Sequence, residues 1–336
     1  MSLNHVKEYN REIREWIIKV FTLAAAISKG QLARRVCPVC GSVESTFFAN
    51  NDYLDYEQCN KCSLIYMNPA PTAEMVAKGF QGEDELLMEY FTIISNYKTG
   101  IPPKPNPLED NKLKDIYAVK PSGKLLDVGC SVGDFLHKAK YFYDVEGVEV
   151  NPHTSAIAEQ HFKVHKHFLG ELDLGPMFDI VTLHQILYGV PDTVGLLRDI
   201  NGVLKDDGLL YINTPNSDSY ALELYRGKAN HLYGYTSLNV FNQQSLAALA
   251  EKTGFKILSC RTEWLDIYLT DLAEFYDHPD SFIHKRNCHL PNYEEKIRQE
   301  DAFHISLNPD LGSRGNYLVA ILGKADRNSA AGIMKP

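Results

Sequence analysis

The chain has 336 residues, 44% of them hydrophobic, which is enough for a sizeable core and more than one average domain needs. Lys and Arg number 34 against 43 Asp and Glu, so the formal net charge is −9, and no basic cluster is interleaved with aromatic residues. This balance disfavours a large polyanion such as RNA as the partner.

The first thirty residues carry apolar side chains at helical spacing. Gly30 follows the series as a helix C-cap, and the series itself is Val6, Tyr9, Ile13, Trp16, Ile17, Val20, Ala24 and Ile27. We expect one amphipathic helix that packs on the next segment or on another subunit. A helix on a membrane surface is the alternative, but Glu8, Glu12 and Glu15 weaken attraction to anionic lipid. Without a signal peptide or a bilayer-spanning run, the sequence predicts a cytoplasmic protein with no membrane partner.

Two Cys-x-x-Cys pairs come next, Cys37 with Cys40 and Cys59 with Cys62, separated by 18 residues. Each pair turns two thiolates toward one ion, and the short hairpins between them need a metal to supply folding free energy. Four thiolates leave no open coordination position, so we predict a structural zinc ion; the length of the intervening segment favours zinc over iron. Redox disulfides are the alternative, which two matched pairs disfavour.

Residues 1–72 are therefore predicted to form an N-terminal helix and a zinc ribbon. Asn68-Pro-Ala-Pro-Thr72 ends this unit, and residues 73–110 are expected to be a helical connection followed by a Pro-rich linker. In the linker, Gly100 to Pro107 contains five helix-breaking residues in eight.

An apolar strand, a glycine turn and a helix follow at Leu125–Leu136, which reads LLDVGCSVGDFL. Glu149 comes 22 residues after Asp127, at the end of the next predicted strand, where a carboxylate can bind a ribose diol. The turn matches Gly-x-x-x-Gly and lacks the Gly-x-Gly-x-x-Gly that seats a pyrophosphate, so S-adenosylmethionine fits better than NAD. Glycines placed for packing alone are the alternative.

From these motifs the chain resembles the class I S-adenosylmethionine-dependent methyltransferases. Two segments look like the family's fourth and fifth strands, Phe178–His184 and Gly208–Asn213. The start of the sixth strand corresponds to Gly254–Leu258, and the last strand, antiparallel and inserted between strands five and six, corresponds to Asn316–Leu322. The resemblance implies an α/β fold: a Rossmann-like seven-stranded methyltransferase sheet, preceded here by the N-terminal helix and zinc ribbon.

The resemblance also implies roles for individual residues. Asp127, Gly129, Ser131 and Gly133 would line the methionine end of the cofactor, and Glu149 would hold the ribose hydroxyls. Ser131 replaces a more usual glycine. Where many relatives have Glu-His, this chain has Tyr188-Gly189, so any role of that family histidine is absent.

Candidates for catalysis lie after strands four and five, where substrate binds in this fold. His184 is the first choice for a base, because imidazole titrates near neutral pH. It is also a candidate cofactor contact. His231 is the second choice and Tyr188 a third catalytic candidate. The alternative is that His184 has a structural role and only donates a hydrogen bond to a loop carbonyl.

The methyltransferase domain is expected to span 111–324, with an insertion over 264–312 and a disordered tail over 325–336. Four histidines lie in the insertion: His278, His284, His289 and His304. The insertion could set substrate specificity or be a surface elaboration. A homodimer would form through it or through the N-terminal helix.

We therefore expect S-adenosylmethionine-dependent methyl transfer to a small molecule. The combined ribbon and core look like bacterial enzymes that methylate sugars, surface polysaccharides and natural products, which implies O-, N- or C-methylation of a sugar or sugar nucleotide. The alternatives are an RNA or protein methyltransferase and a catalytically silent scaffold, the latter suggested by the loss of Glu-His.

Overall fold

The computed structural model describes residues 32–51, 54–98, 111–219, 222–223, 226–232, 237–263 and 314–325, together with Glu12. The predicted N-terminal helix, Pro-rich linker, 264–312 insertion and tail beyond Ala325 lie outside these residues. No helix within the described ranges is long and apolar enough to cross a membrane.

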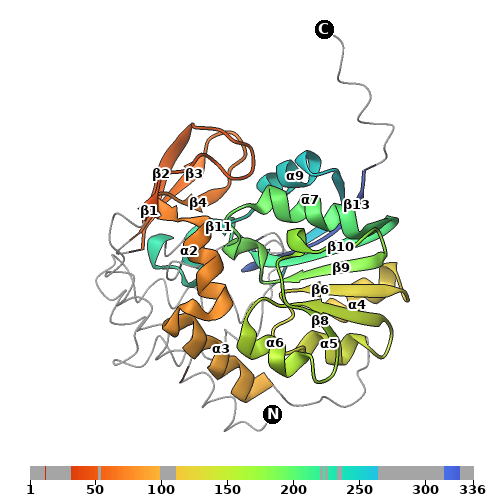
Figure 1. Cartoon of the computed structure of the whole chain (residues 1–336). Coiled ribbons are helices and arrows are strands. Elements are labelled where there is room, and N and C mark those ends of the chain that lie inside the picture. The colour runs from red at the N-terminus through yellow and green to blue at the C-terminus, as the bar shows by residue number, and fades with distance from the viewer. Residues whose placement is uncertain are drawn as a thin grey trace, which may run out of the picture.

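A seven-stranded sheet forms the centre of the molecule, in the order β12-β13-β10-β9-β6-β7-β8 (Figure 1). The strands are β6 (Lys124–Val128), β7 (Asp144–Val148), β8 (Lys163–His165), β9 (Phe178–His184), β10 (Leu204–Pro215), β12 (Phe255–Glu263) and β13 (Tyr317–Lys324). β13 runs antiparallel to both β10 and β12, whereas the other neighbours pair in parallel. The prediction of a seven-stranded methyltransferase sheet with an inserted last strand is confirmed.

Helices cover both faces of the sheet, because parallel strands joined by crossover helices must bury both faces. On one face, α7 (Thr193–Val203) and α9 (Gln243–Lys252) pack with the apolar side chains Leu126, Val128, Leu210 and Ile212 of the sheet. On the other face, α4 (Asn111–Val119) and α5 (Asp134–Ala139) pack with Leu125, Ile180, Tyr211 and Val319. Neighbouring residues of one strand therefore contribute to opposite cores, as the two-residue period of a strand requires.

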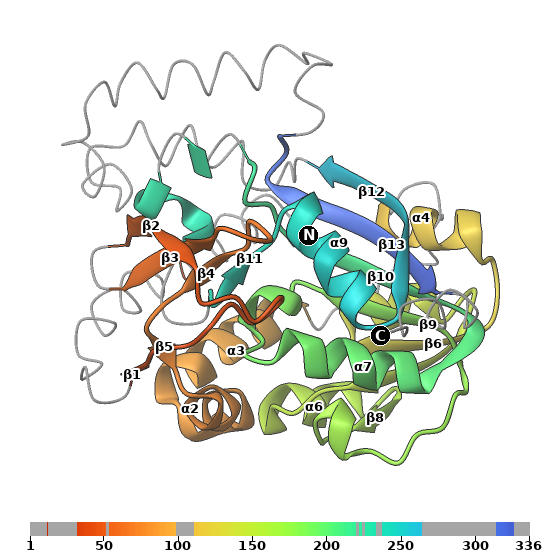
Figure 2. The same cartoon turned by 90° about the horizontal axis from the view of Figure 1, so that it is seen from above.

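The N-terminal region forms a second, smaller sheet of four antiparallel strands in the order β11-β4-β3-β2. Its strands are β2 (Ser45–Asn50), β3 (Asp55–Cys59), β4 (Ile65–Met67) and β11 (Asn239–Val240), while β1 (Leu32–Ala33) and β5 (Ala70–Pro71) pair separately. Figure 2 shows β11 beside β4, although β11 belongs to the methyltransferase part of the chain. The zinc ribbon is thus completed by a strand from the catalytic domain.

The connection between the two sheets is helical over the residues that the structure describes. It consists of α2 (Ala73–Lys78), a π-helical turn (Gly79–Glu83) kinked at Gly82, and α3 (Glu85–Lys98). Thr72 caps α2 by accepting a hydrogen bond from the Met75 backbone N–H. α3 contacts α6 (Pro152–Ala158), the helix that follows the end of β7, so the connection lies beside the carboxyl end of that strand.

Candidate functional site

The glycine turn between β6 and α5 adopts the backbone conformation that its glycines allow. Gly129, Ser131 and Gly133 have φ values of 78°, 52° and 86°, in the left-handed region that glycine tolerates best. The backbone N–H groups of Gly129 and Cys130 both donate to the Val148 carbonyl, which ties the turn to the end of β7. The turn is therefore a compact loop at the carboxyl edge of the sheet.

Each glycine of the turn faces a close neighbour. A β-carbon on Gly129 would lie 2.2 Å from Cδ1 of Ile186, and one on Gly133 would lie 3.0 Å from the Phe162 ring. Gly133 also occupies the N-cap position of α5. Gly129 thus lets the loop after β9 approach the turn, whereas Gly133 lets the first turn of α5 pack on Phe162.

Glu149 reaches back from the end of β7 to the glycine turn. Its Oε2 accepts a hydrogen bond from the Ser131 N–H and its Oε1 accepts one from the Asn151 N–H, both at 2.8 Å. Burial raises the pKa of this carboxyl, and the two backbone N–H groups act against that rise. Glu149 thus lies directly beside the turn, and the ribose-binding role predicted for it stays a prediction.

Asp127 lies within the sheet below the turn. It accepts a hydrogen bond of 2.7 Å from the Thr182 hydroxyl, and burial raises its pKa to about 7. Ser131, in the turn itself, has a buried Oγ without a hydrogen-bond partner among the described residues. A buried hydroxyl in this state calls for a ligand or a water, so the turn fits the methionine end of S-adenosylmethionine.

The structure places His184 inside the protein, whereas the sequence places it at the mouth of the site. Its ring packs against those of Phe135 and Tyr211, with centroids 4.3 and 5.5 Å away, and its Nε2 lies 4.0 Å from Asp127 Oδ1. Its side chain is 11% exposed, yet both ring nitrogens are buried and neither has a hydrogen-bond partner in the part of the chain described. Burial lowers the pKa of His184 well below its usual value.

The other two predicted catalytic residues lie elsewhere. His231 is buried in a 3₁₀ turn (Asn230–Leu232) with its ring 5.4 Å from that of Tyr317, and burial lowers its pKa to about 4. Tyr188 lies in a 3₁₀ turn (Leu187–Gly189) after β9, and its carbonyl accepts a hydrogen bond from the Leu238 N–H. The structure therefore does not bring His184, His231 and Tyr188 together as one constellation.

The four ribbon cysteines do come together. Their sulfur atoms all lie within 4.8 Å of one another, with Sγ–Sγ distances of 3.5 Å for Cys37–Cys62 and for Cys40–Cys59. The hydrogen bond between the Cys37 and Cys62 thiols lowers the pKa of Cys37 to about 5 and raises that of Cys62. Four clustered thiols on two tight turns are the donor set of a tetrahedral zinc site, so this cluster can hold the structural zinc ion.

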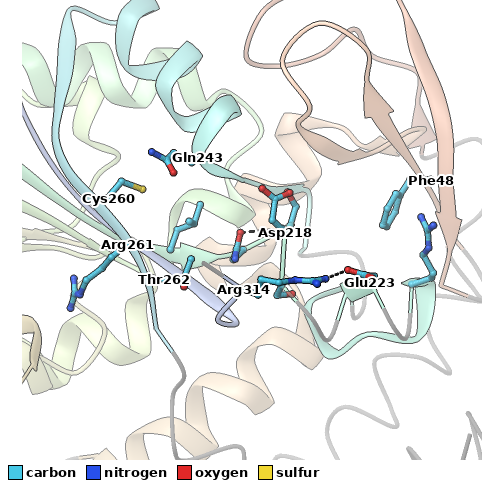
Figure 3. Close-up of a pocket in the computed structure, with 13 residues that line it drawn as sticks. Phe48, Asp218, Glu223, Gln243, Cys260, Arg261, Thr262 and Arg314 are labelled. Carbon is cyan, nitrogen blue, oxygen red and sulfur yellow. Dashed lines mark hydrogen bonds and ion pairs between the residues drawn. The ribbon is translucent and has the colours of Figure 1, made fainter. Parts of the chain in front are cut away.

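A cavity of about 700 Å³ opens beyond the carboxyl end of β10 (Figure 3). It lies between Phe48 of the ribbon strand β2 and the end of β12, and Asp218, Glu223 and Arg314 lie between them. Its lining comprises Phe48, Asn216, Ser217, Asp218, Ser219, Glu223, Arg226, Gln243, Cys260, Arg261, Thr262, Arg314 and Leu318. None of the predicted catalytic side chains lines it.

The sequence pointed to only part of this cavity. Asn216 follows strand five, where the sequence analysis expects substrate to bind, but Phe48, Arg226 and Arg314 carry no local motif. Phe48 lies in the ribbon and the Arg226 guanidinium stacks over its ring at 5.1 Å, so residues from distant parts of the chain meet here. This side of the cavity forms only where the ribbon packs against the methyltransferase domain.

A sequence model of the family described as "Methyltransferase domain" matches residues 109–260. No curated protein matches the chain. Among solved structures, it is similar to 1,6-didemethyltoxoflavin-N1-methyltransferase of Burkholderia thailandensis, with 14% identity, 84% of this chain and 100% of that chain covered, and a TM-score of 0.47. It is similar to an S-adenosylmethionine-dependent methyltransferase of Archaeoglobus fulgidus, with 22% identity, 70% and 99% coverage, and a TM-score of 0.45. It is also similar to phosphoethanolamine N-methyltransferase 2 of Haemonchus contortus, with 17% identity, 78% and 63% coverage, and a TM-score of 0.46.

The match spans the glycine turn, Glu149 and the sheet from β6 to β10, and it ends within β12. The strand order is the one expected from the resemblance. Residues 109–260 are therefore a class I S-adenosylmethionine-dependent methyltransferase domain, and the protein that carries this domain is an enzyme.

Proposed function

We propose that this methyltransferase acts on a small polar molecule that binds in the cavity beyond β10. The observation that carries the proposal is the cavity itself. Its volume of about 700 Å³ lies within the range of small-molecule sites, roughly 300–1,000 Å³. In open α/β sheets, ligands bind outside the carboxyl ends of the strands, which is where this cavity lies.

The cavity lining favours a ligand rich in hydroxyl or charged groups. Hydroxyl, amide, carboxylate and guanidinium groups surround one aromatic side chain, Phe48. Arg314 pairs with Glu223, and Arg261 pairs with Asp115 and Glu263, so much of the charge is already balanced. Ser217 adds a buried hydroxyl that no described residue engages. A sugar or sugar nucleotide, the acceptor class implied by the sequence, suits such a lining.

Within this proposal, S-adenosylmethionine supplies an electrophilic methyl group when it is bound. The glycine turn and Glu149 hold the cofactor, and the cavity residues orient the acceptor for an in-line approach, which is the main source of acceleration. His184 is better suited to contact the cofactor than to take a proton. A base works best with a pKa near the working pH, and burial moves the pKa of His184 well below that.

We further propose that the enzyme works in the cytoplasm, because four metal-binding thiols persist best in a reducing compartment.

The decisive experiment is a search for the methylated product. The purified full-length protein is incubated with methyl-labelled S-adenosylmethionine and, in separate reactions, with cell metabolites, RNA and protein. We expect label in a metabolite of small mass. Label in RNA or protein would overturn the small-molecule proposal, and no label in any fraction would favour a silent scaffold.

Two adjacent phenylalanines on β2 then test the cavity. Phe48 lines it, whereas Phe47 is 68% exposed. Phe48→Ala should raise the KM for the acceptor by roughly tenfold or more, because burying a phenylalanine contributes about 1.5–3 kcal/mol. Phe47→Ala is the matched control and should behave like the wild type. Equal KM values in both variants would remove the acceptor from this cavity.

A further inference from the structure

The zinc ribbon contacts the loop that follows β9. We propose that the ribbon, through Asn239, positions the loop Gln185–Val190 against the cofactor turn, so that Asn239 is a positioning residue for methyl transfer. This inference goes beyond the choice of acceptor and does not depend on the cavity. It rests on a series of hydrogen bonds, and on one side-chain contact at its end, between described residues.

The first link is the strand β11, which joins the catalytic domain to the ribbon. Asn239 and Val240 pair with Tyr66 and Ile65 of β4, and the Met67 N–H donates to the Leu238 carbonyl at 2.9 Å. The ribbon sheet therefore fixes the backbone at 238–240.

The second link is Arg35, two residues before the zinc-binding Cys37. Its guanidinium donates to the Met67 carbonyl at 3.0 Å, to the Leu238 carbonyl at 2.6 Å and to Asn239 Oδ1 at 3.1 Å. A charged, rigid fork of donors orients the Asn239 amide, because its oxygen must face Arg35.

The third link runs from Asn239 to the loop. Because Arg35 holds the Asn239 side-chain oxygen, the Nδ2 of Asn239 points to the Val190 carbonyl and donates to it at 2.7 Å. The neighbouring Leu238 N–H donates to the Tyr188 carbonyl at 3.0 Å. Asn239 is fully buried, so water cannot replace these partners. Two carbonyls of one short loop thus depend on residues that the ribbon holds.

The last link is the contact of this loop with the cofactor turn. Ile186 lies in the loop, and its side chain lies against Gly129. At the start of the loop, Gln185 has a φ of 59° and is tied to β10 through its N–H, which donates to the Asn213 carbonyl at 2.9 Å. Loosening of the loop at its Val190 end would therefore shift Ile186 and change the wall of the cofactor site. Zinc would support catalysis by holding this wall, without touching either substrate.

Hydrogen exchange of the full-length, zinc-loaded protein tests the proposal. Asn239→Asp keeps the acceptor for Arg35 but loses the donor to Val190, so we expect normal zinc content and a protected ribbon. The amides of Gly189 and Val190, which donate to the Ile186 and Leu187 carbonyls, should exchange faster by roughly 5- to 150-fold. The affinity for S-adenosylhomocysteine should fall as well. Asn50→Ala is the control, because Asn50 is an exposed ribbon residue whose side-chain amide donates to Asp55 within the ribbon hairpin.

Cys62→Ser tests the ribbon end of the series. It should lose zinc, and exchange should become faster both in β4 and at Gly189 and Val190. If the loop amides keep wild-type protection in Cys62→Ser or in Asn239→Asp, the ribbon does not position the loop and the proposal is wrong. If Asn239→Asp also loses zinc and ribbon protection, Asn239 acts on the ribbon rather than on the loop, which likewise overturns it.

Discussion

Ile186 and Gly129 are in such close contact that a β-carbon on Gly129 would lie 2.2 Å from Ile186 Cδ1. The two residues belong to the loop after β9 and to the glycine turn after β6, so the absence of a side chain at Gly129 lets this loop pack directly on the turn. The Gly-x-x-x-Gly pattern thus serves both the backbone turn and the packing of a neighbouring loop.

Gly129→Ala should impair cofactor binding and stability together. The left-handed backbone costs an alanine about 1–2 kcal/mol, and the clash with Ile186 adds about 1–3 kcal/mol of overpacking. Gly254→Ala is the control, because Gly254 has the same φ of 78° but only the tip of the Asn201 side chain nearby. Denaturant unfolding and calorimetry with S-adenosylhomocysteine measure both effects. Equal losses in the two variants would show that the Ile186 contact contributes nothing.

Glu149→Gln should weaken binding of S-adenosylhomocysteine by about 1–3 kcal/mol, because an amide nitrogen would face a backbone N–H in place of an accepting oxygen. Glu146→Gln is the matched control, on strand β7, which ends directly before Glu149. Glu146 is a buried carboxylate paired with Lys124, Lys163 and His165, so its loss should lower stability and leave the cofactor affinity unchanged. An unchanged affinity in Glu149→Gln would place Glu149 outside the cofactor site.

Asp127→Asn should change how stability depends on pH. The pKa of Asp127 is about 7 in the folded protein and 3.8 as a reference, so the folded state binds the extra proton between about pH 4 and pH 7. The contribution of Asp127 to stability is therefore fully present below about pH 4 and is lost as the pH rises from 4 through 7. At about 1.36 kcal/mol per pKa unit the loss is of the order of 4 kcal/mol, and Asp127→Asn should remove it. Chemical denaturation of both proteins from pH 4 to pH 8 checks this, and parallel curves would contradict it.

Cys59→Ser should abolish binding of one zinc ion per chain and destabilise the whole protein. Cys37, Cys59 and Cys62 belong to the same buried apolar cluster as Leu246 and Leu249 of α9, so loss of the metal should loosen the catalytic domain as well. Cys260→Ser, which changes a half-buried thiol outside the four-cysteine site, should keep full zinc. Metal analysis with thermal unfolding is the measurement. Full zinc in Cys59→Ser would disprove the assignment.

His184→Phe keeps an aromatic ring between Phe135 and Tyr211 and removes both ring nitrogens. We expect weaker binding of S-adenosylhomocysteine with little change in turnover at saturating cofactor. The opposite result, unchanged affinity with turnover lowered by roughly 10²–10⁴-fold, would identify His184 as the base. His231→Phe separates the second candidate. If only that variant loses turnover, the base lies on the β10 side.

Several features of this protein could be predicted from the sequence because their signals are local. The spacing of Gly129, Gly133 and Glu149 predicts a tight turn and a carboxylate beside it, and the structure has both, while their role toward the cofactor stays a prediction. The paired Cys-x-x-Cys motifs predict one metal cluster. The apolar strand Phe178–His184 has the same bounds as β9. Each of these patterns lies within a short stretch of chain, where backbone and side-chain requirements act directly on residue type.

Other features were decided only by the tertiary structure. β11 has two residues and no recognisable strand pattern, yet it pairs with a strand more than 170 positions earlier. His184 ends a strand that the sequence places at the mouth of the site, but Phe135 and Tyr211 pack over its ring and bury its nitrogens. The cavity wall formed by Phe48 likewise depends on how ribbon and core meet. Burial and long-range pairing depend on which distant segments pack together, and that choice is made by the whole chain when it folds.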